Sequence, residues 1–586
     1  MASPSAAQVT QRVTVGSGGI QGNQICYAPS SISADGRFLL FDSRATNLVP
    51  GDTNNYQDVF VRDRVAGTLQ RVNVGPGGVQ TNNRSGGAAM TPDGRFVLFT
   101  SEASNLVPGD TNGSWDVFIR DRVLGTTERV SVSSSGAEAD AALHASSISP
   151  DGRYVVFSGS ATNLVAGDTN GHEDVFLRDR LNQTTERLSL ASNEAQASGG
   201  PSYNGSVSDD GRYVAFVSLA SNLAPADTNG AVDVFLRDRT AGTTERVTVG
   251  ANPPPPGVLS WADGVQISGN GRFVAFSHDA NNLVPGDTNG VPDIFVRNLA
   301  LGTTERVSVS TAGGQGNDRC FVMPSISSNG RYVAFGSYAT NLVAGDTNVT
   351  QDVFLRDRQL GTTERISLGA SGEQLSWNSS SGCVSPDGRF VTFANFLNFL
   401  PDDSNDLLDG FVRDRVGGTS FTSLCDPGVG GVMPCPCLNP PIGPGRGCNN
   451  SGLTGGAILS ATGGTFLTSD SLVFTTSGQR PATLSIVSQW SSPAAAGITF
   501  GQGVRCATGA LRRLYVKSAE GGSITAPDYT VGDPPVSVRS ASAGDTISAG
   551  QSRWYIVYYR DAVVLGGCPA ASTFNATQTG VVSWAP

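Results

Sequence analysis

Short apolar runs separated by turn residues recur along the first two thirds of the chain. In the first copy a strand at 31–33, an Asp-Gly turn and a strand at 37–41 precede an acidic loop, and a strand at 58–62, a glycine turn and a strand at 70–74 follow it. None of these runs has the period of an amphipathic helix. Each copy therefore predicts four short antiparallel strands.

This pattern is written seven times, at intervals of 57 to 60 residues. Consecutive four-stranded units of this kind are typical of a β-propeller, in which each unit is one blade. Every copy has a phenylalanine at the end of its second strand and another in its third strand, which predicts that these rings pack between blades. The pairs are Phe41 and Phe60, Phe99 and Phe118, Phe157 and Phe176, Phe216 and Phe235, Phe276 and Phe295, Phe335 and Phe354, and Phe393 and Phe411.

The last copy lacks the Thr-Glu-Arg-Val sequence that normally forms the fourth strand. A matching segment, Gln-Arg-Val-Thr-Val, stands at 11–15, before the first copy. We therefore expect an N-terminal strand at 10–15 to complete the last blade, because an unpaired edge would otherwise remain in the ring.

The repeats end near Cys425, and the remaining sequence has a different character. A Cys-, Pro- and Gly-rich junction at 425–450 precedes apolar runs such as 471–474 and 554–559, which are separated by Gly, Ser and Pro turns. This pattern is typical of a β-sandwich. The predicted fold class is all-β, a seven-bladed β-propeller at 1–424 followed, after the junction, by a β-sandwich domain at 451–586.

Two segments of the third copy resemble signatures of the TolB-like, WD40-like propeller family often called PD40. They are the turn Ser149–Arg153 and the strand Asp174–Asp179, which stand where that family has Ser-Pro-Asp-Gly and Asp-Ile-Tyr. The resemblance covers about residues 11–425 and implies the propeller fold. Such propellers serve as interaction platforms, as accessory domains of peptidases and as a few polysaccharide lyases, so the resemblance implies no single function.

The C-terminal part, about 425–586, resembles a domain common at the C-termini of large exported planctomycete-type proteins. The resemblance lies in Cys435–Cys437, Gly447–Ser451, Gly501–Cys506 and Val581–Pro586. It implies surface display or an accessory role in secretion, and no activity that can be assigned to named residues.

The loop between the second and third strands is acidic in every copy, with Asp, Asn and Asp at positions 1, 3 and 7. Calcium takes six to eight oxygen ligands from such groups. Two carboxylates about 4 Å apart repel by roughly 1 kcal/mol in water and about 4 kcal/mol near a protein surface, which favours a bound cation. We predict calcium at seven triplets: Asp52, Asn54, Asp58; Asp110, Asn112, Asp116; Asp168, Asn170, Asp174; Asp227, Asn229, Asp233; Asp287, Asn289, Asp293; Asp346, Asn348, Asp352; and Asp403, Asn405, Asp409.

The alternative for these loops is an Asx turn, in which the first Asp and the Asn bond their own backbone and the second Asp caps a strand. Asp63 is not counted as a ligand, because strand alternation turns it to the face opposite Asp58. The copies of Arg37 and Arg62 are interpreted as structural ion-pair or stacking partners.

In a propeller the acidic loops and the variable connections between blades emerge on the same face. Exposed aromatic residues among Gly, Ser and Asn suit a carbohydrate or a protein partner, although the same side chains could simply fill the central channel. The candidate ligand-binding residues are Tyr27, Arg84, His144, Tyr203, Trp261, Phe321 and Trp377.

Charge and hydropathy narrow the class of protein. The formal net charge is −11 and the sequence has no basic run, which argues against a nucleic-acid partner. No apolar stretch approaches the roughly 20 residues that a membrane-spanning helix needs. The sequence does not predict an oligomeric state, and assembly of chains through the acidic loops is a further possibility.

Six of the nine cysteines lie in the junction and the C-terminal domain, which is typical of a disulfide framework and predicts an extracellular or cell-surface protein. A zinc site at Cys435, Cys437 and Cys448 is the weaker alternative, because the spacing is unusual and a fourth ligand is needed. We expect a disulfide between Cys506 and Cys568. Cys26 and Cys320 share a register position, so a bridge across the channel mouth is a further hypothesis, one that leaves Cys383 buried and free.

The sequence gives little support for catalysis. Its three histidines stand in separate copies, and it has no nucleophile elbow, phosphate loop or zinc-protease helix, so no catalytic residue is assigned. The predicted function is that of an exported, calcium-binding propeller that acts as a binding or structural surface protein. The alternative is a polysaccharide-acting enzyme, a lyase or hydrolase, with its site at the channel mouth.

Overall fold

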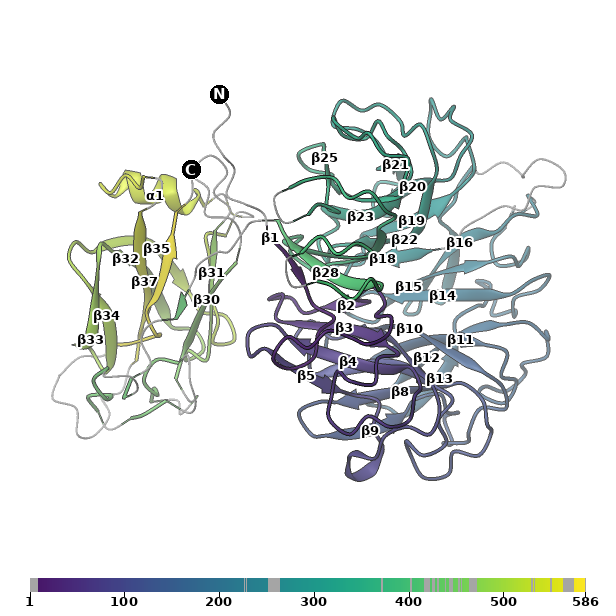
Figure 1. Cartoon of the computed structure of the whole chain (residues 1–586), viewed down its shortest axis with the longest axis horizontal. Helices are drawn as coiled ribbons and strands as arrows, with labels where there is room; N and C mark the ends of the chain where they lie inside the picture. Colours follow the sequence, from purple (N-terminus) through teal and green to yellow (C-terminus); the bar gives the residue numbers. More distant parts are fainter. Residues whose placement is uncertain are drawn as a thin grey trace. The chain divides into compact units, whose positions relative to one another are not determined.

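The computed structural model forms two compact units, residues 10–415 and residues 416–586 with 1–9 (Figure 1). It describes residues 9–225, 227, 229–250, 264–369, 372–400, 403–415, 422–423, 427–428, 432–437, 439–441, 446–451, 454, 456–462, 472–528, 531, 533–548, 551–561 and 574–584. Each unit is treated separately below.

The first unit consists of seven four-stranded antiparallel sheets, the blades, in chain order. Blade 1 has β2 (Ser31–Ile32), β3 (Phe38–Ser43), β4 (Asp58–Asp63) and β5 (Thr68–Arg71), followed by the short 3-10 helix η1 (Pro76–Gly78). Blade 2 has β6 (Ser85–Met90), β7 (Phe96–Ser101), β8 (Asp116–Asp121) and β9 (Thr126–Arg129). Blade 3 has β10 (Leu143–Ile148), β11 (Tyr154–Gly159), β12 (Asp174–Asp179) and β13 (Thr184–Arg187).

The remaining blades repeat this order. Blade 4 has β14 (Ser202–Val207), β15 (Tyr213–Ser218), β16 (Asp233–Asp238) and β17 (Thr243–Arg246). Blade 5 has β18 (Val265–Ile267), β19 (Phe273–His278), β20 (Asp293–Asn298) and β21 (Thr303–Arg306). Blade 6 has β22 (Cys320–Ile326), β23 (Tyr332–Ser337), β24 (Asp352–Asp357) and β25 (Thr362–Arg365). Blade 7 has β26 (Ser380–Val384), β27 (Phe390–Asn395), β28 (Asp409–Asp414) and β1 (Val9–Arg12).

The first strands of successive blades contact each other in order, and β26 of blade 7 contacts β2 of blade 1. The sheets therefore form a closed ring around a central axis, which is the architecture of a β-propeller. The N-terminal strand takes the outer place in blade 7, because β1 pairs with β28 and the Val13 N–H donates to the Gly410 carbonyl at 2.9 Å (Figure 1).

The repeated phenylalanines form the core between blades. In blade 3, Phe157 and Phe176 face each other across two strands with ring centroids 5.8 Å apart, and they pack against Leu98 and Ile119 of blade 2. The equivalent pairs of the other blades are stacked in the same way, at 5.4 to 5.9 Å. Each blade therefore depends on its neighbour to bury its aromatic residues.

The described residues of the second unit form three sheets and one helix, α1 (Val536–Ser542). The largest sheet contains β29 (Thr422–Ser423), β39 (Gly580–Ser583), β37 (Ser552–Arg560), β32 (Leu484–Trp490) and β35 (Arg512–Ser518), with β38 (Phe574–Ala576) paired to β37. The second contains β30 (Ile458–Thr462), β31 (Val473–Ser477) and β36 (Thr525–Ala526), and the third β33 (Ser492–Phe500) and β34 (Gly503–Thr508). Phe474 of the second sheet and Tyr555 of the largest belong to one buried core.

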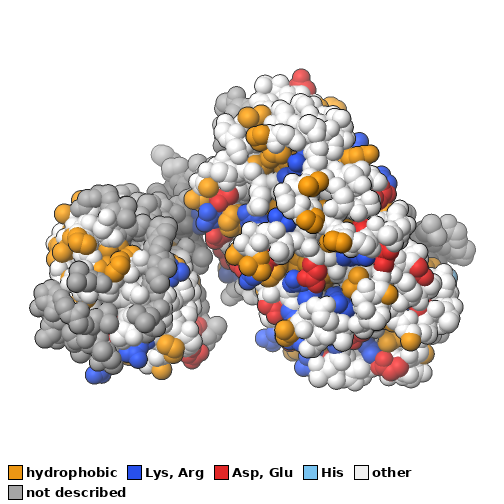
Figure 2. All heavy atoms as spheres, turned by 90° about the horizontal axis from the view of Figure 1, so that it is seen from below, with side chains coloured by type: hydrophobic (Ala, Val, Ile, Leu, Met, Phe, Trp, Pro, Cys, Tyr) orange, Lys and Arg blue, Asp and Glu red, His pale blue; other side chains and the backbone are white. Residues whose placement is uncertain are grey.

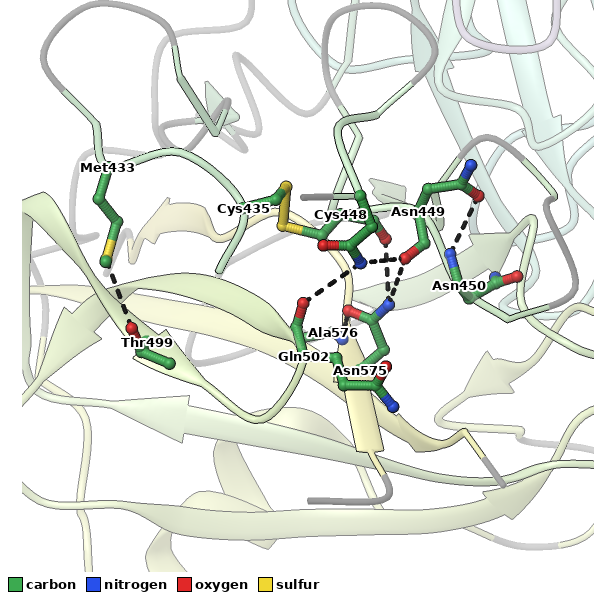
Figure 3. Close-up of a disulfide and its surroundings, with 10 residues drawn as sticks. Met433, Cys435, Cys448, Asn449, Asn450, Thr499, Gln502, Asn575 and Ala576 are labelled. Atoms are coloured by element: carbon green, nitrogen blue, oxygen red, sulfur yellow. Dashed lines mark hydrogen bonds between the residues drawn. A yellow bond between two sulfur atoms is a disulfide. The ribbon is translucent and has the colours of Figure 1, made fainter. Parts of the chain in front are cut away.

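A disulfide joins Cys435 to Cys448 beside β38 (Figure 3). The Asn575 amide nitrogen donates to the carbonyls of Cys448 and Asn449, so the bridged segment is held against the sheet. Cys506 is also disulfide-bonded, whereas Cys568, its predicted partner, lies outside the described residues.

The predicted bridge between Cys26 and Cys320 is wrong, because both thiols are free and buried. The Cys26 sulfur lies 3.1 Å from Ser43 Oγ, and Cys320 packs in the core shared by blades 5 and 6. Equivalent register places each thiol inside its own blade interface rather than across the channel. Cys383 is free, as predicted, but it is half-buried rather than buried.

Two further features concern the surface. In the view of Figure 2, acidic and basic side chains are interspersed over the propeller unit. Within the described residues, no helix has both the length and the apolar character needed to cross a membrane.

Candidate functional site

An arginine stands between the two carboxylates of each acidic loop. In blade 2, Arg129 Nη1 lies 3.5 Å from Asp110 Oδ1 and 3.3 Å from Asp116 Oδ2. This arginine comes from the fourth strand, so pairing of the third and fourth strands carries it to the corner. The arginines in this position are Arg71, Arg129, Arg187, Arg246, Arg306, Arg365 and, from the N-terminal strand, Arg12.

The other polar groups of the loop are also engaged within the protein. Asp116 accepts hydrogen bonds from Ser131 Oγ at 2.6 Å and from Asn112 Nδ2 at 3.0 Å. The amide oxygen of Asn112 accepts the N–H of Ser114, which is an Asx turn, and the asparagine accepts the same i+2 N–H in every copy. The asparagine thus makes the Asx turn of the predicted alternative, whereas the first aspartate pairs with the arginine, and calcium binding by the loops stays a prediction.

Blade 2 alone has a third carboxylate at this corner among the described residues. Carboxylate oxygens of Asp110, Asp116 and Glu138 all lie within 4.8 Å of one another, close enough to hold one metal ion. Glu138 also pairs with Arg129 at 2.5 Å. Burial and the charge of Asp116 raise the pKa of Asp110 to about 6, because both disfavour the ionised form of its carboxyl group.

A cavity of about 590 Å³ lies on the propeller axis. Every blade contributes to its wall, mainly through the first strand or the residues just before it. The lining residues include Ser30, Ser147, Asn204, Gln266 and Ser325, together with glycines and alanines. The wall therefore offers hydroxyl, amide and backbone groups for hydrogen bonds.

One side of this cavity is aromatic. Trp115 and His144 both line it, with ring centroids 6.4 Å apart. The Arg84 guanidinium lies over the Trp115 ring at 5.0 Å and is held by Glu102 at 2.8 Å. Two predicted ligand residues, Arg84 and His144, are thus brought together by a tryptophan that sequence reasoning missed.

The other predicted ligand residues are not gathered there. Tyr203 is half-buried and packs against the core between blades 4 and 5. Trp377 is exposed, and neither it nor Tyr27 lines the cavity. Trp261 lies outside the described residues, as does the side chain of Phe321.

Asp42 lies directly behind the cavity wall. Its carboxylate accepts the Gly87 N–H at 2.7 Å and the Gln57 side-chain amide at 3.3 Å, and Gly87 itself lines the cavity. Burial raises the pKa of Asp42 to about 7, and the two hydrogen bonds only partly oppose that shift. The carboxylate is specific to blade 1, because the other blades have Thr100, Ser158, Val217, Ser277, Gly336 and Ala394 at this position.

The ring of four-stranded sheets defines the protein as a β-propeller. Solved structures similar to this chain include a putative TolB from Agrobacterium tumefaciens, 16% identical over 48% of this chain and 80% of that one, with a TM-score of 0.30. They also include an oligogalacturonate lyase from Vibrio parahaemolyticus, 11% identical over 70% and 97%, TM-score 0.41, and the Cps50 (Swd1) propeller domain from Myceliophteria thermophila, 11% identical over 69% and 99%, TM-score 0.34. No protein-family model and no curated protein sequence matches the chain.

Proposed function

We propose that this chain is an exported binding protein that takes a neutral, hydroxyl-rich ligand such as an oligosaccharide at the mouth of its propeller channel. The observation that carries the proposal is the chemistry of the cavity wall. None of the described lining residues is Asp, Glu, Lys or Arg. Sugar hydroxyls find partners in the Ser, Asn and Gln side chains, and a sugar ring can stack on Trp115.

The same wall weighs against an enzyme. A catalytic channel should bring several ionisable groups to one point, and among the described lining residues His144 and Cys383 are the ionisable ones, with no carboxylate beside them in the wall. Asp42 is the observation that favours the second candidate, a polysaccharide-acting enzyme, because a pKa of about 7 suits a general acid or base. Its carboxylate is, however, already bonded to Gly87 and Gln57.

Calcium remains the proposed cation of the acidic loops, with blade 2 as the strongest site. There, three carboxylates and one guanidinium leave two net negative charges. At the corners of blades 1, 3, 5, 6 and 7 a glutamine replaces Glu138, so one net negative charge remains beside the arginine; these glutamines are Gln80, Gln196, Gln315, Gln374 and Gln21. A dication gains the most binding free energy at the corner where the arginine neutralises the smallest share of the carboxylate charge.

Export is supported by the disulfide between Cys435 and Cys448, since disulfides persist in oxidising compartments. The second unit is proposed to serve surface display or secretion, in line with the resemblance of its cysteine motifs.

The ligand proposal is tested by isothermal titration of the full chain with cellohexaose, xylohexaose and hexagalacturonate. We expect a neutral hexasaccharide to bind with a Kd of about 1 mM or lower and at least about tenfold more tightly than hexagalacturonate. Prolonged incubation should leave all three sugars intact. Preference for hexagalacturonate, cleavage of any sugar, or binding of none would contradict the proposal.

A further inference from the structure

Six of the seven interfaces between blades are closed by the same arginine latch. The arginine follows the third strand of one blade and reaches the preceding blade. Arg180 of blade 3 stacks over Phe96 of blade 2 at 5.0 Å, pairs with Glu128 at 2.8 Å and donates to the Gly152 carbonyl at 2.6 Å. The guanidinium pocket thus consists of an aromatic face, a carboxylate or amide oxygen, and a glycine carbonyl. We call an arginine that fills such a pocket a latch.

The same three partners recur around the ring. Arg122 lies over Phe38 at 4.5 Å, bonds Gln70 at 2.9 Å and donates to Gly94. The remaining latches are Arg64 with Phe390, Gln11 and Gly36; Arg239 with Tyr154, Glu186 and Gly211; Arg358 with Phe273, Glu305 and Gly330; and Arg415 with Tyr332, Glu364 and Gly388.

The interface between blades 4 and 5 has the pocket without the arginine. Blade 5 reads Asn298-Leu299 where the other blades read Asp-Arg. Asn298 still caps its turn, because its amide oxygen accepts the N–H groups of Ala300 and Leu301. Leu299 instead packs against the apolar core between blades 4 and 5, so this position brings no guanidinium to the preceding blade.

The partners of the missing arginine are all in place around a cavity of about 430 Å³. It is lined by Tyr213, Glu245 and Gly271, the counterparts of the ring, the carboxylate and the carbonyl at the other interfaces. Arg212 lies over the Tyr213 ring at 4.6 Å, as its counterparts do elsewhere. Among the described residues Glu245 has no ion pair, whereas its counterparts Glu128, Glu186, Glu305 and Glu364 are each paired.

We propose that this cavity binds the guanidinium group of an arginine side chain presented by a partner protein. The cavity lies at the one interface between blades where the arginine is replaced by leucine. At the other six interfaces the equivalent space is filled by an arginine side chain. Arg272 lines the cavity too, and its counterparts at the filled interfaces each pair with an aspartate that ends the third strand. Asn298 replaces that aspartate in blade 5, so Glu245 is the carboxylate that would pair with an incoming guanidinium. Lysine lacks the planar fork that stacks and pairs at once.

The test uses the full chain and three small probes, N-acetyl-arginine amide, N-acetyl-citrulline amide and N-acetyl-lysine amide, in ligand-observed NMR titrations. Citrulline keeps the shape of arginine and removes its charge. We expect the arginine probe to bind at least about tenfold more tightly than either of the others. No preference for arginine over citrulline would overturn the proposal.

Two arginine variants separate occupation of the cavity from charge repulsion. Leu299→Arg supplies the missing latch, so it should abolish binding of the arginine probe and raise Tm by roughly 1–3 °C. Leu301→Arg adds the same charge at an exposed position in the neighbouring turn and should leave binding nearly unchanged. Retained binding in Leu299→Arg would refute the site. Glu245→Gln, which changes no ion pair of the fold, should weaken the probe at least about tenfold, and an unchanged affinity would refute it as well.

Discussion

Single arginines serve as counter-ions at the corners of this propeller. Arg129 and its copies lie between two aspartates that would otherwise repel each other in a partly buried site. The aspartate at position 7 is nearly inaccessible to solvent, so its charge must be compensated within the protein. An external cation is therefore most needed where one arginine faces three carboxylates.

Calcium affinity should follow this balance of charge. Glu138→Gln removes the third carboxylate of blade 2, and we expect it to weaken the tightest calcium site at least about tenfold from a Kd of roughly 0.1–1 mM. Gln196→Glu is the matched variant, because it places a third carboxylate at the corner of blade 3, and it should raise the affinity of that corner to about that of blade 2. Calorimetric titration with calcium measures both. Binding that is absent from the wild type, or equal in all three proteins, would contradict calcium at these corners.

The Asp42 carboxylate should make stability depend on pH. Its pKa is about 7 in the folded protein and near 3.8 when exposed, so the folded state binds an extra proton between these values. Stability from this group is present at pH 4 and is lost as the pH rises through 7, by about 1.4 kcal/mol for each unit of pKa shift.

Asp42→Asn removes this dependence. The variant should gain Tm relative to wild type as the pH is raised from 5 to 8, in thermal unfolding followed by circular dichroism. Glu245→Gln, at an exposed carboxylate with no ion pair, is the control and should stay parallel to wild type. A constant difference between Asp42→Asn and wild type at both pH values would show that Asp42 is ionised throughout.

Residue-level features were predictable where they repeat in a recognisable place. The phenylalanine pairs follow from strand alternation, because a large ring at the same place in every sheet must be buried. The corner arginine also repeats, thirteen residues after the second aspartate, but an arginine in a polar strand looks like a solvent-facing residue. Trp115 occupies a position with no repeat and gave no signal.

At the scale of one element, β1 links the two ends of the propeller. It pairs with β28, and Arg12 brings the counter-ion to Asp403 at 2.8 Å and to Asp409 at 3.7 Å, with all three side chains nearly inaccessible. The match of residues 11–15 to the fourth-strand sequence predicts this pairing. What the match does not show is that Arg12 faces two buried carboxylates.

Removal of residues 1–16 should therefore destabilise the whole ring. The deletion exposes the edge of β28 and leaves two buried carboxylates without their arginine, and breaking one buried ion pair alone costs about 3–5 kcal/mol. Arg12→Leu should reproduce much of that loss, whereas Gln11→Ala, one residue earlier, should cost far less. An unchanged Tm in the deletion would mean that the ring closes without its first strand.

At the scale of the whole molecule, seven near-identical blades leave little room for function except where one blade departs from the rest. Trp115 and Glu138 in blade 2, Asp42 in blade 1 and Leu299 in blade 5 are such departures. The repeat predicts the fold because the same pattern of buried residues and turns recurs seven times. A residue that departs from the repeat does not predict a function by itself, because its role depends on the residues of neighbouring blades that the fold places beside it.

The most direct test of the account is the effect of two tryptophan substitutions on binding of a neutral hexasaccharide. Trp115 lines the axial cavity, whereas Trp377 is exposed and does not line it. Trp115→Ala should lower the affinity measured by isothermal titration by at least about tenfold, since stacking on an aromatic ring contributes about 1 kcal/mol or more. Trp377→Ala should leave the affinity within about twofold of wild type. Full affinity in Trp115→Ala would contradict ligand binding at the mouth of the channel.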